Sequence, residues 1–160
     1  MENIILWLIN WSKSGDRSLL NSMPNELKKF QKLTKGEIYR GLSLDNINEK
    51  EPISIENFGR SWTYDLQTAE YFSDNAGNGN YSYIFTINFP INALYLNEIY
   101  EMLINIYPKS TDYNEELYNK LKRIFEEYKY EKEVLIIDEY MFFVDYINTQ
   151  MTDYYKVILR

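Results

Sequence analysis

The sequence of 160 residues contains no cysteine and no histidine. Their absence excludes disulfides, zinc sites built from Cys and His, cysteine nucleophiles and every histidine-based catalytic triad. Any acid–base chemistry must therefore depend on carboxylates, lysine or tyrosine. The lack of cysteine also agrees with a reducing compartment.

Long runs of basic residues are absent as well. The chain has 17 Lys and Arg against 24 Asp and Glu, which gives a formal net charge of −7. Because neutralisation of phosphates supplies most of the non-specific affinity for nucleic acids, we expect no direct binding to DNA. An acidic surface of this kind keeps a small protein soluble and repels phosphate backbones.

The apolar stretch near the N-terminus is short. It covers residues 4–9, too few to span a bilayer, and no cationic segment precedes it. It also lacks the small-residue pattern of a cleavage site. We therefore expect a soluble, cytoplasmic protein without a membrane partner.

Apolar and aromatic residues are plentiful. Hydrophobic residues make up 45% of the chain, and 16 residues are tyrosine. This composition supports a real core, and the length favours a single domain over residues 1–160. Packing explains most of the rings, because tyrosine buries a large apolar area while its hydroxyl stays bonded or wet. Stacking of some rings on a flat ligand is the alternative.

Two helices are expected in the N-terminal part, residues 1–35. One spans residues 2–12, and the other, opened by Pro24, spans residues 25–32. Apolar residues at helical spacing define the buried face of each helix. These faces comprise Ile5, Leu8 and Ile9 in the first helix and Leu27, Phe30 and Leu33 in the second.

The core, residues 36–160, mixes short strands with helices. Residues 43–58 are expected to be irregular and residues 73–80 to form an exposed loop, while Asp65 caps a helix that ends near Phe72. The strands are expected at residues 37–42, 60–64, 81–89, 133–137, 141–147 and 154–159.

A helix-rich insertion is expected at residues 92–130. Its clearest helix covers residues 113–128, where charges surround an apolar stripe. The stripe consists of Leu117, Leu121, Ile124 and Tyr128. N-terminal helices followed by short strands with one helical insertion predict an α+β fold with a mixed, largely antiparallel core.

Arg40 is unusual because strand alternation places it on the same face as Ile38 and Leu42. An arginine that points toward a core or a cleft needs anionic or hydrogen-bonding partners. An internal salt bridge is one interpretation. A phosphate ligand is the other, since the guanidinium fork suits phosphate oxygens.

The segment Ser61-Trp62-Thr63 alternates small hydroxyls with a large ring. On a strand, Ser61 and Thr63 face the same side. These hydroxyls either line an edge strand or orient a nearby carboxylate.

Two carboxylates, Glu131 and Glu133, open the hydrophobic strand that follows them and are expected to share one face. Like charges this close repel, and the repulsion separates their pKa values, an arrangement that divides catalytic roles. A solvated start to the strand is the simpler interpretation of an isolated pair.

Taken in order, Tyr39-Arg40-Gly41, Ser61-Trp62-Thr63 and Glu131-Lys132-Glu133 resemble the Arg–Ser–Glu signature of the mono-ADP-ribosyltransferases. The similarity is to the branch that includes iota-type toxins, vertebrate ecto-enzymes and phage-encoded transferases, and it covers residues 36–160. Flanking positions that agree are Phe58, Ala69, Phe72 and Tyr128. The sequence departs from the pattern at Trp62, where the family usually has a small residue. Strand alternation points this ring away from the Ser61 face.

The resemblance implies a two-sheet ADP-ribosyltransferase core that uses NAD+ as co-substrate, with no metal. Arg40 would contact the phosphates, Ser61 would orient Glu133, and Glu133 would stabilise the cationic sugar as nicotinamide leaves. Thr63 would support the NAD+ pocket, and Phe72 would pack near the nicotinamide ring. The implied NAD+ site consists of Tyr39, Arg40, Gly41, Ser61, Trp62, Thr63, Phe72 and Glu133, and the catalytic set of Arg40, Ser61, Glu131 and Glu133.

The resemblance also bears on the acceptor. Glu131 implies an arginine acceptor, whose guanidinium it would pair with and deprotonate, and Tyr128 would lie in the same target-recognition segment. The acidic charge favours a basic target protein, for example one associated with nucleic acid. The alternatives are an NAD+ glycohydrolase toxin and an inactive binding protein of the same fold.

Three biological settings fit such an enzyme. Similarity to phage transferases favours a phage protein that acts on a host protein in the host cytoplasm. A toxin domain delivered by other machinery and one half of a toxin–antitoxin pair are the alternatives.

Overall fold

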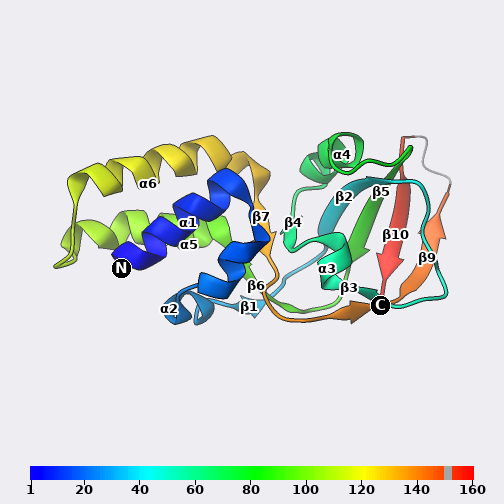
Figure 1. The fold of residues 1–160 in the computed structure, drawn as a ribbon, viewed down its shortest axis with the longest axis horizontal. Helices are drawn as coiled ribbons and strands as arrows, with labels where there is room; N and C mark the ends of the chain where they lie inside the picture. Colours follow the sequence, from blue (N-terminus) through cyan, green and yellow to red (C-terminus); the bar gives the residue numbers. More distant parts are fainter. Residues whose placement is uncertain (150–152) are drawn as a thin grey trace.

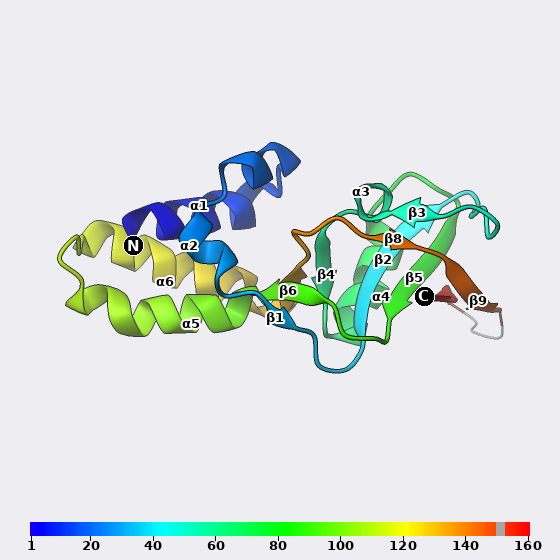
Figure 2. The same cartoon turned by 90° about the horizontal axis from the view of Figure 1, so that it is seen from below.

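In the computed structural model, which describes residues 1–149 and 153–160, the chain forms two lobes, one made mainly of helices and one built around a sheet (Figures 1 and 2). The N-terminus lies in the helical lobe and the C-terminus in the sheet lobe (Figure 1). Strand β7 (Glu133–Leu135) lies between the lobes, and its side chains enter both cores. Val134 packs in the sheet core, whereas Leu135 packs in the helical core, as strand alternation requires.

The helical lobe is built from α1 (Glu2–Ser14), α5 (Leu96–Ile106) and α6 (Glu115–Tyr128). The helices predicted at residues 2–12 and 113–128 both form. Ile5, Leu8 and Ile9 are buried on α1, and Leu121 and Ile124 are buried on α6. The three helices share one apolar cluster, so the insertion packs against the N-terminal helix. In the described part of the chain, no helix is both long and apolar enough to cross a membrane.

The second predicted helix is wrong beyond its first turn. After a 3-10 segment, η1 (Arg17–Ser22), the helix α2 covers only Asn25–Lys28, and the chain then forms strand β1 (Lys32–Leu33). Leu27 is buried as predicted, but Phe30 and Leu33 are 39% and 57% exposed. Strand β1 pairs with β6 (Asn92–Tyr95), a distant partner that local helical spacing cannot reveal. Strand β6 likewise corrects the start of the helix-rich stretch, whose helices begin at Leu96.

The strands form one eight-stranded sheet in the order β1-β6-β7-β4-β2-β5-β10-β9. Only the β5–β10 pair is parallel among the described pairings, so the α+β class and the mixed, largely antiparallel core are confirmed. The strands not yet bounded are β2 (Ile38–Leu44), β4 (Ser61–Thr63), β5 (Tyr81–Ile87), β9 (Val144–Asn148) and β10 (Tyr155–Leu159).

A small second sheet pairs β3 (Ile53–Ser54) with β8 (Met141–Phe142). The prediction that residues 43–58 are irregular is therefore wrong, because this stretch also holds helix α3 (Ile55–Phe58). Buried Ile55 and Phe58 anchor α3 in the sheet core. The single strand predicted at residues 141–147 is divided between β8 and β9, which join different sheets.

The large sheet has a narrow junction where β2 meets β4. These strands are paired at one position, Tyr39 with Thr63. On one side of the junction lie β4, β7 and β6, next to the helical lobe, and on the other lie β2, β5, β10 and β9 (Figure 1). The arginine, serine and glutamate motifs all belong to strands at or next to this junction.

Helix α4 (Leu66–Asn75) covers the β2 side of the junction. Asp65 caps it as predicted, since its side chain accepts a hydrogen bond from the backbone N–H of Thr68. The helix continues past Phe72 to Asn75, so the loop predicted at residues 73–80 begins three residues later than expected. Gly41 allows this packing, because a Cβ there would stand 2.0 Å from the carbonyl oxygen of Ala69.

Candidate active site

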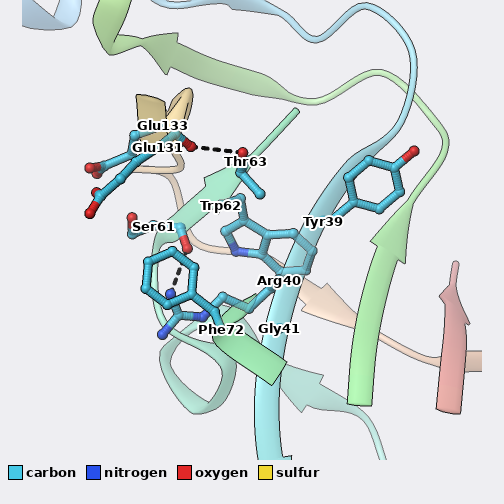
Figure 3. Close-up of a pocket in the computed structure, with 9 residues that line it drawn as sticks. All are labelled: Tyr39, Arg40, Gly41, Ser61, Trp62, Thr63, Phe72, Glu131 and Glu133. Atoms are coloured by element: carbon cyan, nitrogen blue, oxygen red, sulfur yellow. Dashed lines mark hydrogen bonds between the residues drawn. The ribbon is translucent and has the colours of Figure 1, made fainter. Parts of the chain in front are cut away.

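The residues of the three sequence motifs meet in one narrow cavity of about 40 Å³ (Figure 3). Most of them come from β2, β4 and β7, which are neighbours in the sheet, while Glu131 comes from the segment before β7 and Phe72 from α4. The lining residues are Tyr39, Arg40, Gly41, Ser61, Trp62, Thr63, Phe72, Glu131 and Glu133. The predicted NAD+ site is therefore brought together in full, with Glu131 beside it.

Arg40 is held by backbone carbonyls. Its Nε donates to the carbonyl oxygen of Phe58 at 3.0 Å, and its Nη1 donates to that of Ser61 at 2.8 Å. Burial lowers the pKa of the Arg40 guanidinium, and the Glu133 carboxylate opposes that shift. The sequence left two interpretations of Arg40, an internal salt bridge and a phosphate ligand. The two hydrogen bonds of its guanidinium go to backbone carbonyls and therefore do not supply a direct salt bridge.

The neighbouring Arg60 has the structural role instead. It is 5% exposed, pairs with Glu56 and Glu139, and donates to backbone carbonyls that follow β7, such as that of Ile137. These contacts account for its positive charge without a ligand. Arg60 thereby fixes the chain after β7, while the guanidinium of Arg40 lines both the narrow cavity and the cleft beside it.

Trp62 turns its ring into the sheet core, as strand alternation predicted. The side chain is 2% exposed, and its Nε1 donates to the carbonyl oxygen of Gly59 at 3.0 Å. The ring meets Phe58 edge-on at a centroid distance of 6.1 Å. The large residue at this position of the motif therefore leaves the Ser61 face open.

Tyr39 and Gly41 lie on the β2 face opposite to Arg40. The hydroxyl of Tyr39 donates to Glu37 at 3.0 Å, and burial, assisted by this carboxylate, raises the pKa of Tyr39 to about 12. Figure 3 shows the Tyr39 ring pointing away from the Arg40 guanidinium. Both residues line the cavity, but Tyr39 also lines a second pocket on the far side of β2.

Glu133 is the first residue of β7 and has a strongly perturbed carboxylate. Burial raises the pKa of Glu133 to about 7, and the charge of Glu131 adds to this effect. Hydrogen bonds from the side chains of Trp11 and Ser61, together with the charge of Arg40, oppose it. The Trp11 bond joins Nε1 to Oε2 of Glu133 at 2.6 Å.

Glu131 does not lie on the strand, so the prediction of a shared strand face is wrong. It belongs to the 3-10 segment η3 (Lys129–Glu131), and Lys132 then turns the chain with a positive φ of 48°. That turn breaks the alternation on which the prediction depended. The two carboxylates nevertheless line the same cavity, and burial raises the pKa of Glu131 as well.

A wider cleft of about 390 Å³ adjoins the narrow cavity and shares Arg40, Ser61, Phe72 and both glutamates with it. Tyr128, predicted for acceptor recognition, lines this cleft rather than the narrow cavity. The cleft also contains residues that the sequence motifs did not indicate. These are Trp11, Ser12, Lys13, Ser14, Gly15, Arg17, Gly59 and Arg60.

Charges of both signs meet in this cleft. Arg17 acts on Arg40 strongly enough to lower its pKa further, so two guanidinium groups face one region. Glu131 and Glu133 provide the opposite charge. An anionic group and a cationic group can therefore be bound in one cleft. No local pattern marks Trp11 or Arg17, because their position depends on the packing of α1 against β7.

No group of three or more His, Cys, Asp or Glu residues that could hold a metal ion occurs in residues 1–149 and 153–160. Comparisons of the chain with protein-family models, with curated proteins and with solved structures found no match. Any function must therefore be argued from the geometry of the cleft.

Proposed function

We propose that the protein is a mono-ADP-ribosyltransferase that cleaves NAD+ and transfers ADP-ribose to the arginine side chain of a target protein. The observation that carries this proposal is the convergence of Arg40, Ser61 and Glu133 on one cavity from three neighbouring strands. The three residues were selected from the sequence, through the resemblance of their ordered motifs to the Arg–Ser–Glu signature, and unrelated residues have no reason to meet in this way.

The chemistry of NAD+ cleavage requires these residue types. When the bond between C1′ of the ribose and the nicotinamide nitrogen breaks, nicotinamide leaves with the bonding electron pair and the sugar becomes an oxocarbenium-like cation. A fixed carboxylate stabilises this charge as it develops, and Glu133 is a half-buried carboxylate in the cavity. The ring of Phe72 lies beside Ser61 and Arg40, where a flat leaving group can stack (Figure 3).

The phosphates of NAD+ need cations in the cleft. Arg40 and Arg17 supply two guanidinium groups near one another, and Lys13 lines the same cleft. Since guanidinium groups bind phosphate oxygens in a bidentate manner, these cations suit a diphosphate.

Glu131 supplies the chemistry of the acceptor. An acceptor guanidinium would pair with Glu131, give up a proton to it and form the new bond between its nitrogen and C1′. The raised pKa of Glu131 favours this role, because a more basic carboxylate accepts a proton more readily. The net charge of −7 would attract a basic target surface.

Labelled NAD+, incubated with the purified chain and a bacterial lysate, tests the proposal. We expect a labelled protein band that is absent with Glu133→Ala, provided that both proteins give the same circular dichroism spectrum. Free ADP-ribose without a band in this or other lysates indicates an NAD+ glycohydrolase. No NAD+ turnover by either protein contradicts the proposal and favours an inactive binding protein.

A further inference from the structure

The indole of Trp11 reaches the proposed catalytic glutamate from the helical lobe. Its Nε1 donates to Oε2 of Glu133 at 2.6 Å, across 122 positions of the chain. Charge-assisted hydrogen bonds to carboxylates are short and strong. We infer that Trp11 is a positioning residue for Glu133, and that the N-terminal helix thereby helps to hold this carboxylate in the orientation that the reaction needs.

The indole is itself held in place from the other side. Trp11 is 4% exposed and stacks on Trp7 with a centroid distance of 5.6 Å and an interplanar angle of 6°. Trp7 is anchored in turn, since its Nε1 donates to the carbonyl oxygen of Leu19 at 2.8 Å. Two stacked rings, each with a satisfied N–H, therefore fix the direction of the bond to Glu133.

The carboxylate has room for a substrate beside Trp11. Its two oxygens offer about four acceptor positions. The indole of Trp11 and the hydroxyl of Ser61 account for two of them. A ribose hydroxyl of NAD+ can therefore be bound while both positioning contacts remain. This part of the inference rests on the proposed function.

The charges around Glu133 come from every element packed against it. Glu131 precedes it, Arg40 lies on β2, and the charge of Glu133 helps to raise the pKa of Tyr100 on α5. Tyr128, Lys129, Lys13 and Arg17 line the pockets that contain Glu133. The described N–H donor from the helical lobe to its carboxylate is the indole of Trp11. Loss of this donor must raise the pKa of Glu133, because the bond stabilises the ionised form.

The first experiment needs neither substrate nor a change at Trp11. In the protein with ¹⁵N-labelled tryptophan, we expect the indole N–H signal of Trp11 to shift with pH, with a midpoint at about 7. In Glu133→Gln the amide oxygen still accepts the bond, but the titration must disappear. The indole signal of Trp7 is the internal control and should not titrate. The inference is overturned if the chemical shift of the Trp11 indole N–H does not change with pH, or if it changes equally in Glu133→Gln.

The second experiment measures NAD+ cleavage by Trp11→Phe, with Trp7→Phe as the matched control. Phenylalanine keeps a ring in the stack and removes the N–H donor together with part of the indole volume, a loss of volume that Trp7→Phe shares. We expect the apparent pKa of kcat in Trp11→Phe to rise by about one unit, with a roughly fivefold loss at pH 7 that shrinks above pH 9. The KM for NAD+ should stay within about twofold of the original value.

Trp7→Phe separates positioning from packing. It removes the bond to Leu19 but keeps a ring stacked on Trp11, so its thermal stability should fall while its pH profile stays unchanged. If both variants show the same profile, Trp11 acts only through packing and the inference is wrong. If the protein cleaves no NAD+, the proposed function fails, while the indole titration still decides whether Trp11 controls Glu133.

Discussion

The hydroxyl of Thr63 donates a 2.8 Å hydrogen bond to the backbone carbonyl of Glu131, drawn as a dashed line between these two residues in Figure 3. Thr63 is also paired with Glu133 across the β4–β7 ladder. A single buried threonine thus connects the segments that carry both glutamates. The middle motif therefore fixes the segment proposed for acceptor recognition as well as the strand proposed to act on NAD+.

Glu131→Gln should separate the two reactions of the proposed enzyme. The amide cannot take a proton from an acceptor guanidinium, whereas Glu133 keeps its carboxylate and loses only the nearby charge of Glu131, which raises its pKa. We expect transfer to a protein acceptor to fall at least about 100-fold, in line with the loss of a general base. NAD+ hydrolysis should be retained. Measurement of labelled protein and free ADP-ribose in the same reaction checks this, and equal loss of both products would contradict it.

Thr63→Val should disturb the position of Glu131. The hydroxyl donates to the Glu131 carbonyl and accepts from the backbone N–H of Asp65 at 3.0 Å, and Thr63 is 4% exposed. We expect a loss of about 1–3 kcal/mol in the free energy of unfolding. The ratio of transfer to hydrolysis should also fall.

Thr34→Val is the control for this prediction. Thr34 is 5% exposed, and its hydroxyl accepts from the backbone N–H of Ile91 at 3.1 Å, away from the cleft. It should lose comparable stability in urea unfolding and keep the same product ratio. A similar change of ratio in both variants would show that the effect in Thr63→Val is not local.

How far the fold is predictable depends on the range of the contacts. Helices α1 and α6 were predicted because their apolar spacing is local, and the alternation on β4 correctly separated Trp62 from Ser61. The prediction of the second helix was wrong because β1 pairs with the distant β6. The prediction for Glu131 was wrong because the chain turns at Lys132, so that Glu131 lies outside the strand. Local patterns cannot report either event.

The candidate site follows the same distinction. Arg40, Ser61 and Glu133 were selected from ordered motifs, and the structure brings them to one cavity. Trp11 and Arg17 could not be selected, because nothing near them in the sequence marks them as polar partners of a site. They enter the cleft only because the helical lobe packs beside β7.

The stability of the protein should fall as pH rises through the titration of Glu133. Its pKa lies at about 7 in the folded protein against an ordinary value of 4.5, so the unfolded chain releases this proton first. Between these two pH values the folded state binds more protons, and the free energy of unfolding decreases as pH rises.

Glu133→Gln removes this titration and keeps an acceptor for Trp11. We expect the variant to be more stable than the original protein above pH 7, by about 2–3 kcal/mol, with little difference at pH 4. Urea unfolding at the two pH values measures this. An equal difference at both pH values would indicate a packing effect instead.

Arg40→Lys should weaken NAD+ binding although the charge is kept. The guanidinium bonds the Phe58 and Ser61 carbonyls through Nε and Nη1, a geometry that one ammonium group cannot reproduce. We expect the KM for NAD+ to rise about tenfold or more, since a charged hydrogen bond is worth about 1.5–3 kcal/mol. Lys28→Arg, at an exposed position of α2, is the control and should leave the KM for NAD+ unchanged. An unchanged KM in Arg40→Lys would contradict a phosphate-binding role.

Gly41→Ala should separate the roles of β2 and α4 in the site. A Cβ at Gly41 would stand 2.0 Å from the carbonyl oxygen of Ala69 and 2.6 Å from the backbone N of Ser73, so α4 has to move. Because Phe72 lies on α4 between these two contacts, its ring must leave the cavity together with the helix. We expect a large loss of thermal stability. In the protein that still folds, the NMR signals of Phe72 should shift less when nicotinamide is added.

Gly36→Ala provides the comparison for this substitution. Its Cβ would meet no atom within 4 Å, although its φ of 73° makes alanine cost about 1 kcal/mol of backbone strain. This variant should therefore lose a little stability without any change in ligand contacts at Phe72. Since Gly41 lies in β2 and Gly36 shortly precedes this strand, a difference between the variants isolates the close approach of α4 to β2. If they behave alike, that approach does not control the position of Phe72.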